Sequence, residues 1–378
     1  MSPLTYLEID LDAIAHNVRV IKMHIGPHVK LIAVVKANAY GHGALEVAQT
    51  ALRHGASWLA VARADEGISL RQAGIVAPIL VMNYTPLGEI EEALRHDLTL
   101  TLSDLEPARS ISAIASRLGR AATVHIKVDT GMGRFGLLPD EVLPFMQELA
   151  ALPGVQVEGL YTHFAVADLA DKDYTRQQFR RFQQVRDRLS AAGYRIPLCH
   201  AANSAATLDL PETHLDAVRV GIAMYGLPPS SEVEPAVPLR PALSLKSHVA
   251  RVRTLPAGSS ISYGRTYITP REMTVALVPV GYGDGYHRLI SNRGAVLING
   301  RRAPIVGRVC MDQVIVDVSQ AGLVELNSEV VLIGSQGKER ITAEEVATWA
   351  ETINYEVVTA LLPRVPRLYV GTEADSLR

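Results

Sequence analysis

The sequence lacks most of the features that mark a secreted, membrane or metal-binding protein. Its 378 residues include only two cysteines, Cys199 and Cys310, which lie far apart in the chain and indicate a reducing cytoplasm rather than a disulfide framework. No apolar run reaches the roughly 18 residues of a membrane span, so we expect no membrane contact. The N-terminal segment is acidic where a signal peptide needs a basic start and an apolar stretch.

The sequence also lacks a large excess of charge of either sign. Lysine and arginine total 37 and aspartate and glutamate 39, a net charge of −2 that offers no basic field for a nucleic acid. None of the twelve histidines forms an HExxH motif and the cysteines form no CxxC pair, so we expect no metal site. The hydrophobic fraction of 48% and the length predict a folded chain with a large core and two domains.

Short β-branched segments alternate with stretches of helical period through the first two thirds of the chain. The eight strand candidates cover residues 31–36, 57–62, 78–82, 97–102, 122–129, 155–164, 197–203 and 216–221. The longer helix candidates between them cover residues 43–55, 64–74, 105–119, 139–154 and 174–193. Eight strands with intervening helices predict an α/β fold, a TIM-type (β/α)8 barrel.

The pattern changes after a proline-rich segment at 228–241, which contains five prolines and is typical of a linker. The segments beyond residue 241 are strand-like, with an Asn299-Gly300 pair typical of a two-residue hairpin turn and one short helix expected near 342–353. The sequence therefore predicts a barrel domain over 1–240 and a mostly β domain over 241–378. A lone strand at 5–11 precedes the barrel and is a candidate to pair with the second domain.

Reactive side chains gather where the barrel strands are expected to end, and in such barrels these ends build the active site. They are Lys36, His163, His200 and Arg219, together with His125 and Lys127 on the fifth strand and Arg134 in the loop that follows that strand. Lys36 ends an apolar strand, so desolvation would lower its pKa, as Schiff-base chemistry requires. A lysine that merely extends its charge out of the barrel end is the alternative.

The loops after the seventh and eighth strands are the expected phosphate site of such a barrel. They offer the hydroxyl of Ser204 and the backbone amides near Gly221 and Ile222. A lysine and a phosphate cradle at one barrel mouth predict pyridoxal 5′-phosphate (PLP) as the cofactor. A generic phosphorylated metabolite would satisfy the phosphate cradle equally well.

Motifs along nearly the whole chain resemble those of the alanine racemase family. They include VVKANAYGHG around Lys36, VHIKVDTGMGRFG, HAANSA, VRVGIAMYG, SYGRTY, VGRVCMDQ and INYEVVT, in the family's order. One departure is Gly283, where alanine is more usual. The resemblance implies a homodimer in which the β domain of one subunit closes the barrel mouth of the other. It also implies an isomerase that interconverts L- and D-alanine by a PLP-dependent two-base mechanism and supplies D-alanine for peptidoglycan.

The resemblance further implies a role for each matching residue at the reacting centre. Lys36 would carry PLP covalently and act as one base, and Tyr263 would reach in from the neighbouring subunit as the other. Arg219 would face the pyridine nitrogen of the cofactor, with His200 supporting it. His163 would lie between Tyr263 and Arg219.

Other matching residues would bind the ends of the cofactor and the substrate. The phosphate would be held by Tyr40, Ser204, Gly221, Ile222 and Tyr355. Arg134 and the backbone of Met311 would take the substrate carboxylate. Lys127 occupies a position that is often carbamylated in this family, where the resulting carboxylate orients Arg134; the sequence leaves open whether Lys127 carries this modification.

The sequence leaves three alternatives open. The first is a serine or broader amino-acid racemase. One methylene or hydroxyl on the substrate changes the free energy of binding in the pocket by only about 1–3 kcal/mol, a difference that the sequence does not resolve. A decarboxylase of basic amino acids shares the barrel-plus-β plan, but its motifs differ from those seen here. A non-catalytic PLP-carrier barrel would lack a β domain. Without the resemblance, Tyr263 would be interpreted as a packing residue in a turn.

Overall fold

The structure is a computed structural model that describes residues 3–377. By internal contacts the chain divides into two units. The barrel unit comprises Ala13–Ala39 and Ala44–Arg240. The second unit comprises the chain up to Asp12, the short stretch Tyr40–Gly43 and the chain from Pro241 onward. Within residues 3–377, the helices include none with the length and apolarity needed to cross a bilayer.

Eight parallel strands close into a barrel, which confirms the predicted fold class. They are β2 (Lys30–Val34), β3 (Trp58–Val61), β4 (Ile79–Val81), β5 (Thr99–Leu102), β6 (Ala122–Lys127), β7 (Val155–Tyr161), β8 (Leu198–His200) and β9 (Ala217–Val220). The ring closes where β9 pairs with β2, with Arg219 opposite Ile32. Each strand overlaps one of the eight segments predicted from the sequence, and its ends differ from the predicted ends by up to three residues, most at the C-terminal ends of β7 and β8.

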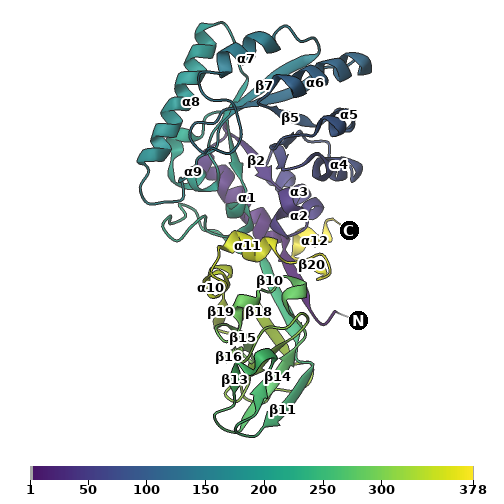
Figure 1. Ribbon diagram of the computed structural model, residues 1–378, viewed down its shortest axis with the longest axis vertical. Coiled ribbons are helices and arrows are strands. Elements are labelled where there is room, and N and C mark those ends of the chain that lie inside the picture. The colour runs from purple at the N-terminus through teal and green to yellow at the C-terminus, as the bar shows by residue number, and fades with distance from the viewer. Residues whose placement is uncertain (1–2, 378) are drawn as a thin grey trace. The chain divides into compact units, whose positions relative to one another are not determined.

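Helices lie on the outside of these strands (Figure 1). They are α1 (Leu11–Ile25), α3 (Ala44–Arg53), α4 (Ala64–Gln72), α5 (Ile90–Arg95), α6 (Leu105–Leu118), α7 (Val142–Leu149), α8 (Asp173–Ala191) and α9 (Ser204–Asp209). The segment labelled α2 (Lys36–Tyr40) is a short turn with left-handed backbone angles at Ala37, Asn38 and Ala39. In α6, Ala108, Ile111 and Ala115 form one buried stripe, and the helix ends at Gly119 in the left-handed conformation. The six-residue helices α5 and α9 were not predicted, because they are too short to show helical periodicity.

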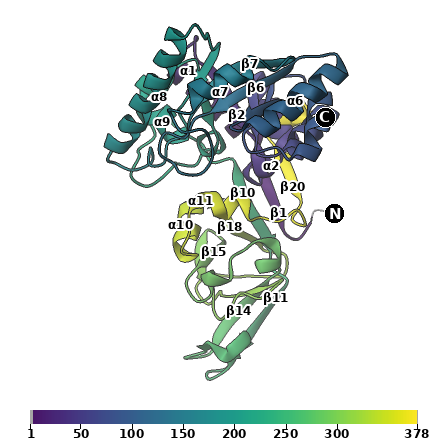
Figure 2. The same cartoon turned by 45° about the horizontal axis from the view of Figure 1, so that its top comes forward.

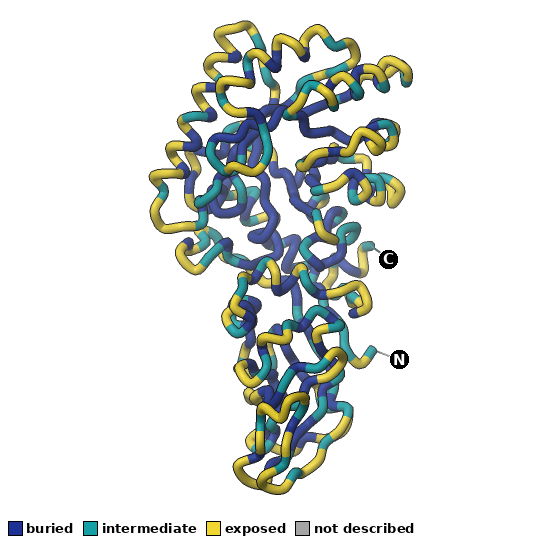
Figure 3. The backbone as a smooth tube through the Cα atoms, in the orientation of Figure 1, coloured by how far each residue is buried: buried dark blue, intermediate teal, exposed yellow. Residues whose placement is uncertain are grey.

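The barrel strands are buried along most of their length, as the dark blue core in Figure 3 shows. Every residue of β3, β5 and β9 is buried. Strands covered on both faces read as continuous apolar runs in the sequence. Buried ionisable residues among them, namely His125 and Lys127 in β6, His200 in β8 and Arg219 in β9, are therefore exceptions that need an explanation.

The second unit is built mainly from strands (Figure 2). Its largest sheet has the order β16-β15-β18-β10-β1-β20, with β19 paired to β18. These strands are β1 (Tyr6–Asp10), β10 (Leu243–His248), β15 (Ala295–Ile298), β16 (Arg301–Pro304), β18 (Glu329–Gln336), β19 (Glu339–Ile341) and β20 (Arg367–Val370). The N-terminal strand β1 pairs antiparallel with β10 and parallel with β20.

Smaller elements complete the second unit. A three-stranded sheet contains β11 (Arg251–Leu255), β14 (Met273–Val278) and β17 (Val314–Asp317), and a short ribbon contains β12 (Ser260–Ile261) and β13 (Tyr267–Ile268). The helices are α10 (Ala343–Trp349), α11 (Asn354–Thr359) and α12 (Thr372–Asp375).

In the second unit the predicted hairpin turn is confirmed, whereas the predicted helix has the wrong length. Ile298 pairs with Arg301 across Asn299 and Gly300, whose φ angles of 53° and 69° suit the predicted two-residue hairpin. The single helix predicted near 342–353 is wrong in its extent. It ends at Trp349, Glu351 has a φ of 55°, and a separate helix begins at Asn354.

Candidate active site

Lys36 follows the end of β2 and begins a turn at the mouth of the barrel. Its side chain is half-buried. Burial lowers the pKa of Lys36, and the neighbouring charge of Arg134 lowers it further, whereas Glu66 raises it. The predicted environment of this lysine is therefore present: a partly desolvated amine that loses its proton more readily than an exposed one.

Arg219 is the most constrained cation of the barrel interior. Its guanidinium donates to the carbonyl oxygens of Thr162 at 2.7 Å and Ala201 at 3.0 Å, and to the Nδ1 atoms of His200 at 2.8 Å and His163 at 3.3 Å. Only 3% of the residue is exposed. Burial lowers the pKa of Arg219 to about 10, which still leaves it protonated near neutral pH. The four contacts fix the orientation of the guanidinium plane.

The two histidines beside Arg219 are consequently neutral, with their tautomers set by it. A guanidinium only donates hydrogen bonds, so Nδ1 of each ring must accept, and the ring proton of a neutral imidazole then sits on Nε2. Burial, followed by the charge of Arg219, holds the pKa of both His163 and His200 well below its usual range. The Nε2 proton of His200 points to Nδ1 of His125 at 3.0 Å.

Lys127 is the last residue of β6 and is also buried, with 5% of it exposed. Its Nζ donates to the carbonyl oxygens of Val128 at 3.2 Å and Phe135 at 3.4 Å. Burial and then the charge of Arg219 lower its pKa to about 7. Close to neutral pH, a large fraction of this amine is unprotonated and nucleophilic.

Asp129 organises the glycine-rich loop that carries Arg134, a role that the sequence reasoning missed. Its carboxylate accepts backbone N–H groups from Gly131 at 2.9 Å, Met132 at 2.8 Å, Gly133 at 3.1 Å and Arg134 at 3.0 Å. Burial alone would raise the pKa of Asp129, but these hydrogen bonds outweigh it and hold the pKa below its usual range. An aspartate that opens a loop of glycines is the signal that would have revealed this turn.

Backbone and hydroxyl donors meet where β8 and β9 end. The Oγ atom of Ser204 accepts the N–H of Gly221 at 3.0 Å and the N–H of Ala223 at 3.4 Å, which leaves its own hydrogen free to donate. Ile222 begins the short 3-10 helix η3 (Ile222–Tyr225), so its N–H has no acceptor within that helix. The structure thus brings Ser204, Gly221 and Ile222 together, and the hydroxyl of Ser204 and the N–H of Ile222 are donors that suit a phosphate.

In the second unit, Tyr263 and Met311 line one pocket of about 340 Å³, together with Ser262, Cys310, Asp312 and Gln313. Both residues are more than half exposed, Tyr263 at 68% and Met311 at 53%. The carbonyl oxygen of Met311 accepts the N–H of Gly283 at 2.8 Å. Across residues 3–377, the N–H of Met311 meets no acceptor, so it remains available to a ligand.

Two further predicted residues meet in the second unit. The rings of Tyr40 and Tyr355 lie 6.3 Å apart between centroids, at an interplanar angle of 49°. Burial raises the pKa of Tyr40 to about 12, so its phenol stays protonated and can donate a hydrogen bond.

At Gly283, the family's more usual alanine would place a Cβ 3.0 Å from the Met311 carbonyl oxygen. The glycine leaves the Met311 loop that space.

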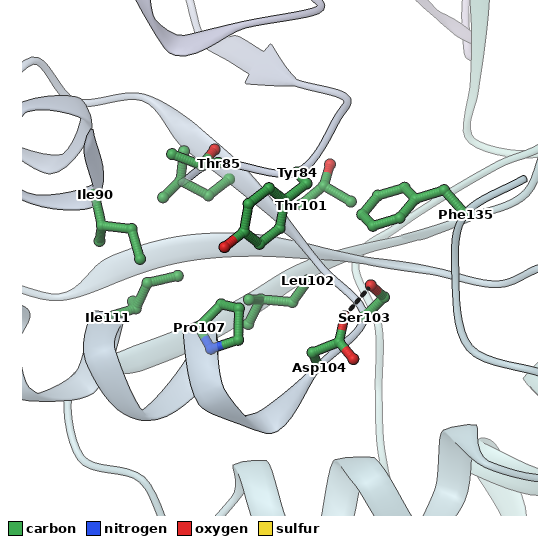
Figure 4. Close-up of a pocket in the computed structure, with 11 residues that line it drawn as sticks. Tyr84, Thr85, Ile90, Thr101, Leu102, Ser103, Asp104, Pro107, Ile111 and Phe135 are labelled. Carbon is green, nitrogen blue, oxygen red and sulfur yellow. Dashed lines mark hydrogen bonds between the residues drawn. The ribbon is translucent and has the colours of Figure 1, made fainter. Parts of the chain in front are cut away.

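A separate pocket in the barrel unit contains none of the predicted site residues (Figure 4). Its volume is about 10 Å³, and apolar side chains such as Ile90, Ile111 and Phe135 form much of its lining. Ser103 and Asp104, which also line it, are hydrogen-bonded to each other at 2.9 Å. This pocket is too small for a substrate and is a packing defect of the barrel wall.

Comparison with known proteins covers nearly the full chain. The family model for the alanine racemase N-terminal domain matches residues 9–229, and that for the C-terminal domain matches residues 242–369. The alanine racemase of Desulforamulus reducens is 50% identical over 97% of this chain and 99% of its own length. That of Symbiobacterium thermophilum is 50% identical over 98% of each.

Solved structures give the same result. The alanine racemase of Clostridium difficile 630 superposes with a TM-score of 0.94 at 40% identity, covering 99% of this chain and 97% of that one. The alanine racemase of Bacillus anthracis with bound L-Ala-P gives 0.93 at 42% identity, covering 99% and 96%. Sequence and fold agree, and the chain belongs to the alanine racemase family of isomerases.

Proposed function

We propose that this racemase is a PLP-dependent homodimer that interconverts L- and D-alanine, with Lys36 and Tyr263 as its two bases. The observation that carries the proposal is the position of Arg219, which donates to Nδ1 of both His163 and His200 deep in the barrel. This arrangement uses a buried arginine to orient two neutral rings. A purely structural core has no need of such a group, because burying a charge is costly.

The residues present fit the cofactor. When bound, PLP withdraws electrons from the α-carbon of an amino acid, so that the α-proton becomes acidic. The half-buried amine of Lys36 has the lowered pKa that a covalent link to an aldehyde requires. The hydroxyl of Ser204 and the N–H of Ile222 supply neutral donors for the phosphate, and Gly221, Tyr40 and Tyr355 complete the proposed set.

Two bases on opposite faces of the α-carbon can remove a proton from one face and return one to the other without turning the substrate. Lys36 supplies one. A tyrosine phenol has an ordinary pKa of about 10 and needs a donor nearby to act as a base near neutral pH. His163 accepts from Arg219 through Nδ1, so its Nε2 proton is free to stabilise the phenolate of Tyr263. The proposed partner of His163 is the Tyr263 of the neighbouring subunit.

Arg219 also limits side reactions. We place its guanidinium against the pyridine nitrogen of the cofactor, where most PLP enzymes have a carboxylate. An arginine does not give up its proton readily, so it leaves that nitrogen unprotonated. The electron sink is then weaker, which disfavours transamination relative to racemisation.

The substrate carboxylate is proposed to meet Arg134 and the N–H of Met311. Lys127 is proposed to react with carbon dioxide, its free amine forming a carbamate and releasing one proton. Its pKa of about 7 supports this step, because only the unprotonated amine attacks carbon dioxide. The resulting negative charge would balance the cationic neighbours Arg219 and Arg134.

The proposed role is to supply D-alanine for peptidoglycan, and the proposed location of the enzyme is the cytoplasm. A reducing compartment of this kind suits its two unpaired cysteines. The test is racemase activity on L-alanine and L-serine, together with the visible absorbance of the purified protein. We expect faster turnover of L-alanine and a cofactor band that disappears in Lys36→Ala. Racemisation retained by that variant would overturn the assignment of Lys36.

A further inference from the structure

The backbone after Lys36 adopts a conformation that L-amino acids rarely take. Ala37, Asn38 and Ala39 have φ and ψ angles near +50°, and Tyr40 has a φ of 53°. Four consecutive non-glycine residues thus lie in the left-handed region, where the Cβ atom crowds the following carbonyl oxygen. A run of this kind persists only where surrounding contacts hold it, and such runs occur at functional sites.

The side chain of Glu66 makes one of the contacts that join this turn to the rest of the barrel, beside the hydrogen bond from the N–H of Ala44 to Oδ1 of Asn38 at 2.9 Å. Glu66 lies in the first turn of α4, and its Oε1 atom accepts the N–H of Ala37 at 2.5 Å. The other oxygen, Oε2, accepts the N–H groups of Ala62 at 2.8 Å and Arg63 at 3.1 Å. The carboxylate therefore ties the residue after Lys36 to the loop between β3 and α4, across 29 positions of the sequence.

Capping of α4 accounts for only half of this arrangement. A capping glutamate needs one oxygen for the helix start, and here Oε2 performs that task. Oε1 is directed away from the helix to the first left-handed residue. The adjacent Arg63 does not neutralise Glu66, because its guanidinium is paired with Asp65 at 3.0 and 2.9 Å. The negative charge of Glu66 is thus left to act on Lys36, whose proton it helps to retain.

Other charges face Lys36 as well. Arg134 and Glu66 act on its ammonium with opposite sign, and Lys36 in turn acts on His163. Glu66 is the group among these that both contacts the backbone next to Lys36 and attracts its charge. Loss of Glu66 would therefore change the direction of the Lys36 side chain and its proton affinity together.

We propose that Glu66 is a positioning residue for Lys36: it holds the left-handed turn that directs the amine into the barrel mouth and compensates the amine's charge. This inference rests on the proposed function of Lys36 as the covalent anchor and base. Within that function, it assigns to Glu66 a part in catalysis that acts only through Lys36.

Glu66→Gln and Glu66→Asp test the proposal, with Asp65→Asn as the matched control on the same helical turn. Asp65 contacts the side chain of Arg63 and does not reach Ala37. The first readout needs no cofactor: the pH dependence of amine acylation at Lys36, measured by mass spectrometry on cofactor-free protein. The second is the rate of hydrogen exchange of the Ala37 amide.

For Glu66→Gln we expect the acylation midpoint of Lys36 to fall by roughly half to one pH unit, because an attractive charge is removed. Glu66→Asp keeps the charge but is shorter, so the midpoint should stay near that of the wild type while Ala37 exchange accelerates. In the holoenzyme, both variants should lose about 10- to 100-fold in kcat with little change in KM, as expected when a reacting group is misplaced. Asp65→Asn should match the wild type in all three measurements.

Wild-type acylation and exchange in Glu66→Gln, with only a lower melting temperature, would show that Glu66 is merely a helix cap and overturn the proposal. Failure of the proposed function is distinguishable. Retained racemisation in Lys36→Ala would remove the catalytic role of Lys36, whereas the acylation and exchange results on cofactor-free protein would still report whether Glu66 holds the turn.

Discussion

Arg219 fixes the ring of His200: its guanidinium donates to Nδ1 at 2.8 Å, and His200 can then only donate from Nε2, toward His125 at 3.0 Å. The same guanidinium fixes His163 in the same sense. One buried cation thus determines the protonation of two rings, so its replacement should disturb both.

Arg219→Lys should lose racemase activity and stability together. A lysine retains the charge but lacks the planar fork, so the carbonyl oxygens of Thr162 and Ala201 would not both be satisfied. We expect a loss of about 2–4 kcal/mol in the free energy of unfolding, measured by urea titration. Arg109→Lys, at an exposed ion pair with Glu148, is the control and should change little. Equal effects in the two variants would contradict the role given to Arg219.

Lys127 predicts a pH dependence of stability. Its pKa is about 7 in the folded protein against an ordinary value of 10.5, so between these values the unfolded chain binds the proton and the folded chain does not. Stability should therefore rise with pH through this window, by about 1.4 kcal/mol per pH unit. Below the window the folded chain also binds the proton, so the free-energy cost of burying the charged amine is then at its maximum. In Lys127→Met this contribution should vanish. Unfolding titrations in carbon dioxide-free buffer measure the difference, and parallel curves would exclude the predicted shift.

Asp129→Asn should weaken substrate binding. The amide has one acceptor oxygen in place of two, so the four N–H groups of the loop lose part of their anchor and Arg134 is displaced. We expect KM for alanine to rise about tenfold with a smaller change in kcat. Asp140→Asn, 93% exposed in its side chain, provides the control. A fall in kcat alone would place Arg134 elsewhere than on the substrate carboxylate.

Asp129 also contributes to acid sensitivity. Its folded pKa lies below the ordinary value, so its stabilisation is present above the unfolded pKa and is lost as the pH falls through the folded pKa. His163 and His200 act in the same direction, because their lowered pKa values mean that only the unfolded chain binds protons as the pH first falls below the ordinary range. The melting temperature of the wild type should therefore fall as the pH is lowered into the acid range, and the melting temperature of Asp129→Asn should fall less steeply over the same range.

Mixed dimers test whether Tyr263 serves the neighbouring subunit. A Lys36→Ala chain combined with a Tyr263→Phe chain would form one site with both lesions and one with neither. Two inactive variants should then regain up to about half of the wild-type activity per mixed dimer. The exposure of Tyr263, at 68%, fits a side chain that finds its partner outside its own chain. Mixed dimers that form but stay inactive would show that Tyr263 acts within its own chain.

Local sequence patterns by themselves determined the barrel and the hairpin, and they made Lys36 a candidate for the reacting centre. Most of the eight strands appear as apolar β-branched segments because they are buried on both faces, and the Asn299-Gly300 turn needs only two adjacent residues that accept positive φ. Lys36 was recognisable from its place after an apolar strand, and the motif resemblance supplied Tyr263 and Met311.

The motif resemblance already implied that His163 and His200 lie near Arg219, but only the tertiary structure decided which atoms meet, and it added the contact of Glu66 with Ala37, which no motif implied. The contacts of Glu66 with Ala37 and of Arg219 with His163 join residues 29 and 56 positions apart. The pairing of β1 with both β10 and β20 likewise joins the two ends of the chain. Such contacts leave no periodic trace in the sequence, because they depend on where separate strands and loops are brought when the barrel and the sheet close.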